Sequence, residues 1–70
     1  MLLTKREIML WQKLSLSSVD RRLAEMKKYP IYRGYIFVDG KVRIDDKAFE
    51  HYCLYGFLLE RGYPVPKIGE

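Results

Sequence analysis

The sequence has one cysteine, one histidine and no long apolar run. A single cysteine excludes an intramolecular disulfide and any metal site built from several cysteines, and it fits a reducing compartment. No run approaches the roughly 18 apolar residues of a membrane-spanning helix, and the first residues lead directly into charge without a signal-peptide pattern. We therefore expect a cytoplasmic protein that makes no use of a membrane.

Residues that commonly carry catalysis are also scarce. His51 has no cysteine or second histidine at ligand spacing, so no metal site is predicted. His51 and Cys53 lie two residues apart, and side chains at that spacing on a helix diverge by about 200°. Seventy residues form one small domain, which has little room for a catalytic cleft together with the residues that would support it. We expect no enzymatic activity and no cofactor.

The sequence does have positive charge, and it is unevenly placed. The formal net charge is +4. Residues 1 to 34 carry eight basic and three acidic side chains, which gives +5, whereas residues 35 to 70 carry five basic and six acidic ones, which gives −1. This asymmetry favours a polyanion as the partner of the first half of the chain.

The stretch from Ser15 to Lys28 predicts an amphipathic helix. Ser15 is a good N-cap, and Pro30 ends the helix because the residue before a proline avoids helical backbone angles. The helical spacing brings together three apolar side chains, Val19, Leu23 and Met26. The opposite row is small, polar or cationic, and it consists of Ser17, Arg21, Ala24 and Lys28. Such a row can enter a major groove, where arginine bonds to guanine edges.

A shorter helix is predicted before this one. Thr4 as N-cap and Glu7 three residues later form a capping box, and Leu3 and Ile8 occupy the positions of a hydrophobic staple. The helix is expected to end near Lys13, with Ile8 and Trp11 turned inward. Two short helices joined this closely are typical of a helix-turn-helix, although the joint lacks the glycine that is common there.

Two runs of β-forming residues flank Asp39-Gly40, and residues 31 to 34 are β-formers as well. Asp-Gly between such runs favours a hairpin with a two-residue type I′ turn. That turn sets Val38 opposite Lys41 and fixes the remaining pairs. The predicted core face is Tyr35, Phe37, Val42 and Ile44, and the predicted outer face is Ile36, Val38, Lys41 and Arg43. The outer face presents two cations that can lie along a phosphate backbone or reach a minor groove.

A last helix is expected to begin at Asp45 or Asp46, with Phe49, Tyr52 and Cys53 on its inner face and Cys53 as a small core residue. Continuation to Gly62 is favoured over an end near Tyr55. The continued helix carries more apolar surface than one face can bury, which indicates self-contact or a partner surface. The domain is predicted to span 1–62, and 63–70 to form an extended, loosely held tail.

The order of these elements predicts a small α+β fold of the winged helix-turn-helix kind, with two short helices, a two-stranded antiparallel hairpin or wing, and a C-terminal helix. The residues also resemble a known group. The similarity lies in Leu3-Thr4, Ser-Leu-Ser-Ser-Val-Asp-Arg-Arg-Leu from Ser15, Tyr29-Pro30, and Ile-Asp-Asp-Lys-Ala-Phe after the hairpin. These resemble the excisionases of temperate phages and conjugative elements, nearest the lambdoid excisionases within the broader MerR-like winged helices. The resemblance covers roughly residues 2 to 53.

The resemblance implies a bacterial or phage-encoded, nucleoid-associated protein that binds double-stranded DNA side by side with further copies and bends it. The bending assists a tyrosine integrase in excising a mobile element. Carried over by position, the base contacts fall on Ser17 and Arg21, and a third position, basic in the lambdoid relatives, is Ala24 here. The predicted DNA backbone and wing contacts are Ser18, Arg22, Lys28, Arg33, Lys41 and Arg43.

Two alternatives remain open for the protein as a whole. With the same DNA contacts it can be a small transcriptional regulator of a phage or mobile element. It can also be a protein-interaction module that works through its apolar C-terminal helix. For single residues, the alternatives are that Arg21 pairs with Glu25 one turn later, and that Lys41 and Arg43 only protect a strand edge.

Overall fold

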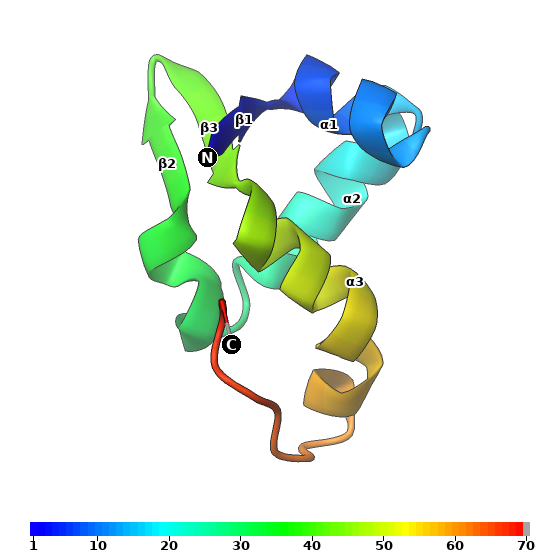
Figure 1. Cartoon of the computed structure of the whole chain (residues 1–70), viewed down its shortest axis with the longest axis vertical. Helices are drawn as coiled ribbons and strands as arrows, with labels where there is room; N and C mark the ends of the chain where they lie inside the picture. The colour runs from blue at the N-terminus through cyan, green and yellow to red at the C-terminus, as the bar shows by residue number, and fades with distance from the viewer. Residues whose placement is uncertain (70) are drawn as a thin grey trace.

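The sheet has one strand more than the sequence predicts. In the computed structural model, which describes residues 1–69, β1 (Leu2–Thr4) pairs antiparallel with β3 (Lys41–Asp45), and β3 pairs antiparallel with β2 (Ile36–Asp39). The strand order is β1-β3-β2, with β3 in the centre (Figure 1). The small α+β fold with two helices, an antiparallel hairpin and a C-terminal helix is confirmed, and β1 extends the predicted two-stranded hairpin to three strands.

The first helix begins where the capping box predicts. In α1 (Lys5–Gln12) the Thr4 hydroxyl accepts from the Glu7 amide at 3.2 Å, and the Glu7 carboxylate accepts from the Thr4 amide at 3.0 Å. Leu3 and Ile8, the two predicted staple residues, are both buried in the core. Leu3 therefore serves twice, as the staple of α1 and as a strand residue of β1.

Lys13 takes the place of the missing glycine at the joint between the helices. Its φ of 54° and ψ of 48° lie in the left-handed region. The carbonyl of Met9 accepts from the amide of Lys13 and, at 3.0 Å, from that of Leu14. This satisfies a free carbonyl at the end of α1 in the manner of a Schellman motif, at the expense of backbone strain in a residue with a Cβ.

The second helix buries the predicted face. In α2 (Leu16–Met26) the hydroxyl of Ser15 caps the start by accepting from the Ser18 amide at 3.2 Å. The three apolar residues that periodicity selects, Val19, Leu23 and Met26, are all buried. The helix ends at Met26, two residues before the predicted end at Lys28, and Tyr29 is extended ahead of Pro30 as the proline requires.

Residues 31–34, which are β-formers, form no strand. They fold into a 3-10 helix, η1 (Pro30–Tyr35), in which Pro30 occupies an early position that suits its fixed φ. Tyr32 is fully buried and is the largest residue of the core. Because η1 includes Tyr35, β2 begins one residue later than the predicted strand.

The predicted hairpin register is wrong by one residue. Only Gly40, with φ 77°, lies between the paired Asp39 and Lys41, so Val38 faces Val42 and Phe37 faces Arg43. The face of β2 is therefore inverted relative to the prediction, since a shift of one residue turns each side chain to the other side of the sheet.

The correct core face of the hairpin consists of Ile36, Val42 and Ile44. The prediction that Phe37 belongs to the core is wrong, because its side chain is 47% exposed on the outer face. Tyr35 packs against the core, but from η1 and not from a strand. Lys41 and Arg43 stay on the outer face, as predicted, and now share it with Phe37.

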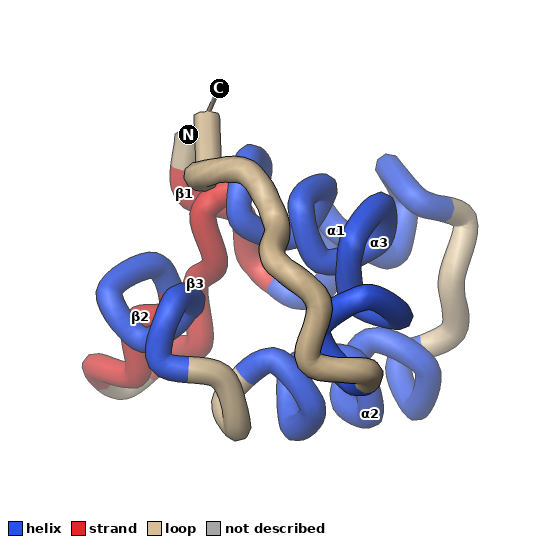
Figure 2. The backbone as a smooth tube through the Cα atoms, turned by 90° about the horizontal axis from the view of Figure 1, so that it is seen from below, coloured by secondary structure: helices blue, strands red, loops and turns tan. Residues whose placement is uncertain are grey.

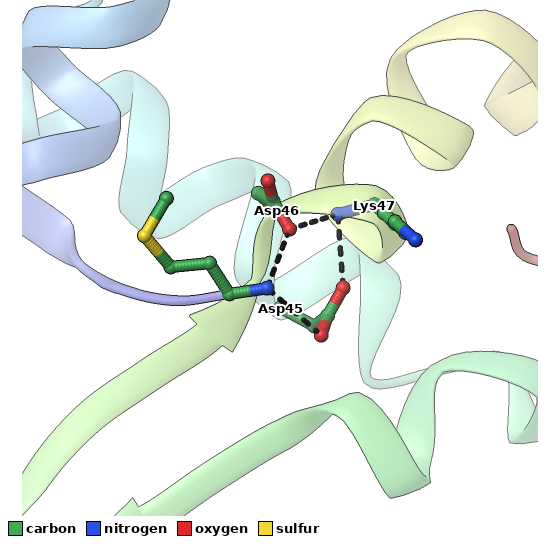
Figure 3. A network of polar contacts seen from close by, with 4 residues as sticks. Asp45, Asp46 and Lys47 are labelled. Carbon is green, nitrogen blue, oxygen red and sulfur yellow. Dashed lines mark hydrogen bonds and ion pairs between the residues drawn. The ribbon is translucent and has the colours of Figure 1, made fainter.

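The last helix is capped by a network of charges. In α3 (Asp46–Glu60) the carboxylates of Asp45 and Asp46 both accept from the Lys47 amide at 2.9 Å. The ammonium of Met1 lies 3.0 Å from Asp46 and 3.7 Å from Asp45 (Figure 3). The hydrogen bond between them raises the pKa of the Met1 ammonium and lowers that of the Asp46 carboxyl.

The favoured continuation of this helix is confirmed. It runs through Gly56 to Glu60, and Gly62 follows with φ 76° while the Tyr63 amide bonds to the Leu58 carbonyl at 2.9 Å. Phe49 of the predicted inner face is buried, and Tyr52 is half-buried. The prediction of Cys53 as a core residue is wrong, because its side chain is exposed.

Trp11 also departs from the expected core position. Its side chain is 43% exposed, and its ring lies 6.2 Å from that of Phe49 at a tilt of 53°. The indole therefore packs near Phe49 while a large part of it meets solvent. Among residues 1–69, no helix has both the length and the apolar character needed to cross a membrane.

The tail is held by the lone histidine. Figure 2 shows the tail running back from the end of α3 across the molecule. Residues 63–67 have no regular structure, but His51 Nε2 lies 2.6 Å from the Pro66 carbonyl oxygen, and Ile68 packs on the core. These two contacts attach the predicted tail to the domain at Pro66 and Ile68; Glu70 lies outside the described residues.

We expect Lys13→Gly to stabilise the protein by about 0.5 kcal/mol, because glycine relieves the left-handed strain but adds freedom to the unfolded chain. Lys27→Gly is the matched control, since Lys27 ends α2 with an ordinary φ of −63°. It should destabilise the protein by about 0.5–1 kcal/mol. Urea unfolding measures both changes. Equal losses in the two variants would contradict strain at Lys13.

Tyr32→Phe tests the histidine junction. The Tyr32 hydroxyl lies 2.7 Å from His51 Nδ1, and the opposite nitrogen must donate because the Pro66 carbonyl only accepts. Removing the hydroxyl leaves a buried acceptor unpaired, so we expect a loss of about 1–3 kcal/mol in unfolding free energy.

The control is Tyr35→Phe, since the Tyr35 hydroxyl has no hydrogen bond to residues 1–69. It should change the unfolding free energy by less than about 0.5 kcal/mol. Similar losses in both variants would show that the Tyr32 hydroxyl adds nothing beyond the packing of its ring.

Candidate nucleic-acid interface

The exposed row of α2 is the first part of the candidate interface. Ser17, Arg21 and Ala24 are exposed on the side opposite the buried Val19 and Leu23. The row is shorter than predicted, because Lys28 lies beyond the last helical residue and belongs to the following turn. Arg21 is therefore the one cation that the helical part of this row presents.

Three consecutive side chains of α2 point in three different directions, as the 100° step of a helix requires. Asp20 pairs with Lys5 of α1 at 2.7 Å between Oδ1 and Nζ. Arg22 donates from Nη1 to the sulfur of Cys53 in α3 at 3.1 Å. Arg21 lies between them and faces solvent. The flanking contacts add restraints on the rotation of α2 about its axis, and Arg21 takes the outward direction.

Arg21 has no ion pair within residues 1–69. Glu25, the alternative partner of Arg21, instead forms an ion pair with Lys28, with 3.2 Å between Oε1 and Nζ. The guanidinium of Arg21 is consequently available to an external acceptor. Lys28, the predicted backbone contact, is exposed but already shares its charge with Glu25.

The serines at the start of α2 are partly engaged with one another. The Ser15 hydroxyl lies 3.2 Å from that of Ser17 and donates to that of Ser18 at 3.0 Å. Ser18 is half-buried and also donates its amide to Ser15, whereas Ser17 is exposed. Ser17 therefore keeps hydrogen-bonding capacity on the outward side, while the groups of Ser18 contribute to the helix cap.

Arg22, a predicted backbone contact, is half-buried and turned towards α3. Its neighbours there include Tyr52, Phe57 and Glu60, which line a shallow depression beside Cys53. Desolvation raises the pKa of the Cys53 thiol, and the adjacent guanidinium partly opposes this. The structure therefore separates Arg22 from the row of Ser17 and Arg21, and its phosphate contact stays a prediction.

The wing forms the second part of the candidate interface. Lys41 and Arg43 are exposed on the outer face of β3, and neither forms an ion pair with residues 1–69. Phe37 is the residue that sequence reasoning missed here, because the predicted register buried it. Arg33 is exposed in η1, the segment that leads directly into β2.

The two parts come from different sides of the molecule. In the view of Figure 1, the β2–β3 hairpin lies on the left and α2 on the right, with the start of α3 between them. The principal extents of the chain are 31 × 22 × 21 Å. One turn of B-DNA spans about 34–36 Å, so a major groove and the next minor groove are roughly half that distance apart. The longest dimension of the chain therefore exceeds the spacing between a major groove and the next minor groove.

His51 and Cys53 do not form a site together. His51 is buried and bonded through both ring nitrogens, whereas Cys53 is exposed and contacts Arg22. Within residues 1–69, no three histidine, cysteine or acidic side chains lie close enough together to hold a metal ion. The exposed cations Arg21, Lys41 and Arg43, which form no ion pair with residues 1–69, suit the binding of an anion.

Comparison with known proteins gives no further assignment: no protein-family model matches the chain, and neither curated proteins nor solved structures show significant similarity to it.

Proposed function

We propose that the protein is a sequence-selective, double-stranded DNA-binding architectural protein of the excisionase type. In this proposal α2 enters a major groove and the wing of β2 and β3 meets the adjacent minor groove. Binding bends the DNA and assists a tyrosine integrase in excising a mobile element. The helix and the wing share one core, because Val19 and Leu23 of α2 and Ile44 of β3 are buried in the same cluster.

The observation that carries the proposal is the state of Arg21. It is exposed on the helix that packs its other face into the core, and it lacks an ion pair with residues 1–69. An arginine so placed presents its planar group of donors outward, and this group matches the two acceptors on the major-groove edge of guanine. Ser17, one turn earlier and also exposed, adds a shorter donor and acceptor.

A transcriptional regulator of a mobile element would use the same contacts. Both roles need a DNA-reading helix and a wing, and they differ only in the consequence of binding. Excision with a purified cognate integrase and a supercoiled substrate distinguishes them. Recombination that depends on this protein supports the excisionase role, whereas promoter repression without any effect on recombination supports the regulator.

We expect Arg21→Ala to weaken binding to the preferred duplex by about 1–3 kcal/mol, and binding to random duplex by much less, because a base contact carries sequence information. The preferred site is first obtained by selection from a random duplex library. Fluorescence anisotropy then measures both affinities. The matched control is Arg61→Ala, which removes an exposed arginine at the end of α3.

Equal losses on preferred and random DNA would reduce Arg21 to a backbone contact and remove the proposed sequence reading. Affinity of the parent protein that does not fall with salt would contradict DNA binding altogether, since phosphate contacts release counterions.

A protein contact through α3 is the second candidate, and one observation favours it. Leu54 and Phe57 are each 56% exposed and lie one turn apart on α3, so they form one apolar strip. Leu58, which the sequence includes in the excess apolar surface, is half-buried. In the excisionase reading this strip joins neighbouring copies on DNA, and in the other reading it binds a different protein.

We expect the double variant Leu54→Asp, Phe57→Asp to bind a single site normally but to lose cooperative binding on DNA with several sites. Sedimentation velocity of the protein–DNA complexes measures the number of bound copies. Leu10→Asp is the control, because Leu10 is a comparably exposed leucine on α1. Unchanged cooperativity in the double variant would show that this strip does not join copies.

A further inference from the structure

Phe37 places an aromatic ring beside two cations on the exposed face of the wing. It is 47% exposed on the outer face of the wing, directly opposite Arg43 in the register of β2 and β3. Lys41 is its diagonal neighbour on the same face, within reach of long side chains. The aromatic ring therefore has a cation beside it on the neighbouring strand and a second one towards the tip.

The two faces of the wing differ in charge. The face opposite to Phe37 carries Ile36, Val38 and Val42, and Val38 is 66% exposed near the tip without a cation beside it. The Phe37 face carries both cations of the hairpin together with one acid near the tip, Asp39. A polyanion finds positive charge on the Phe37 face alone, so charge complementarity decides which side of the ribbon can meet DNA.

We infer that the Phe37 face of the wing is its DNA-contacting surface, with Phe37 making an apolar contact in the minor groove while Lys41 and Arg43 reach the flanking phosphates. The inference rests on the proposed DNA-binding function. The minor groove is about 6 Å wide, and proteins that bind it frequently insert apolar side chains between base steps. The ring of Phe37 buries its exposed part there, and the cations hold the ribbon in register.

This arrangement separates two contributions to affinity. The cations release counterions and give binding its salt dependence, whereas apolar burial depends little on salt. Phe37→Ala should therefore weaken binding about ten-fold, which corresponds to about 1.4 kcal/mol, by a factor that stays constant between about 50 mM and 200 mM salt. Lys41→Ala and Arg43→Ala should each reduce the steepness of the salt dependence by about 0.9.

Val38→Ala is the matched control, since Val38 is the adjacent residue and is exposed on the opposite face. It should leave the affinity within about two-fold, since surface changes away from a contact are usually within ±0.5 kcal/mol. Phe37→Leu should keep most of the parent affinity because it restores an apolar side chain. Circular dichroism of every variant establishes that the fold is retained, as expected for changes at exposed positions. Anisotropy titration on one duplex at several salt concentrations gives all affinities and slopes.

The outcomes separate the inference from the proposed function. Parent binding with Phe37→Ala unaffected overturns the inference and leaves the proposed function standing. A loss confined to Val38→Ala, or a Phe37→Ala loss that changes the salt slope, also overturns it. Absence of DNA binding by the parent protein overturns both. A salt-independent loss in Phe37→Ala, restored by Phe37→Leu, supports it.

Discussion

The central position of β3 is the constraint on which the rest of the structure depends. Ile44 is fully buried and is paired on one side with Leu3 and on the other with Ile36. These three apolar residues occupy one row across the sheet and cannot shift by one residue without turning outward. The same strand leads directly into the cap of α3 at Asp45. The register of Ile44 thus determines the orientation of the wing and the start of the last helix together.

Local rules predicted the helices well because their signals lie within a few residues. The capping box of Thr4 and Glu7 and the spacing of Val19, Leu23 and Met26 involve no distant contact, and the structure confirms both. The pairing of β1 with β3 joins residues about forty apart in the chain, and no local pattern encodes it. The predicted register of the wing was wrong for a similar reason. The pairing of Ile36 with Ile44 outweighed the turn preference of Asp39-Gly40.

The candidate site likewise has a part that local sequence patterns predict and a part that depends on contacts between distant residues. Periodicity alone places Ser17 and Arg21 on the exposed side of α2, and the structure agrees. Whether Arg21 is free depends on a choice that the sequence leaves open, because Glu25 can pair with either Arg21 or Lys28. The exposed position of Phe37 could not be predicted, because the assumed two-residue turn placed it on the core face. The one signal for it in the sequence is an aromatic residue in a run whose alternate residues, Ile36 and Val38, can equally supply a core face.

The residues on both sides of Arg21 make lateral contacts, Asp20 with α1 and Arg22 with α3. The ion pair of Asp20 with Lys5 is partly exposed, so its net stabilisation is small, and the bond from Arg22 to a sulfur is weak as well. The two contacts add little to stability, but they restrain the orientation of α2. The buried row of Val19 and Leu23 already fixes which side of α2 faces the core, and the two lateral contacts add restraints towards α1 and α3. These restraints set the position of the Arg21 backbone, while its side chain forms no ion pair with residues 1–69 and stays available to an external acceptor.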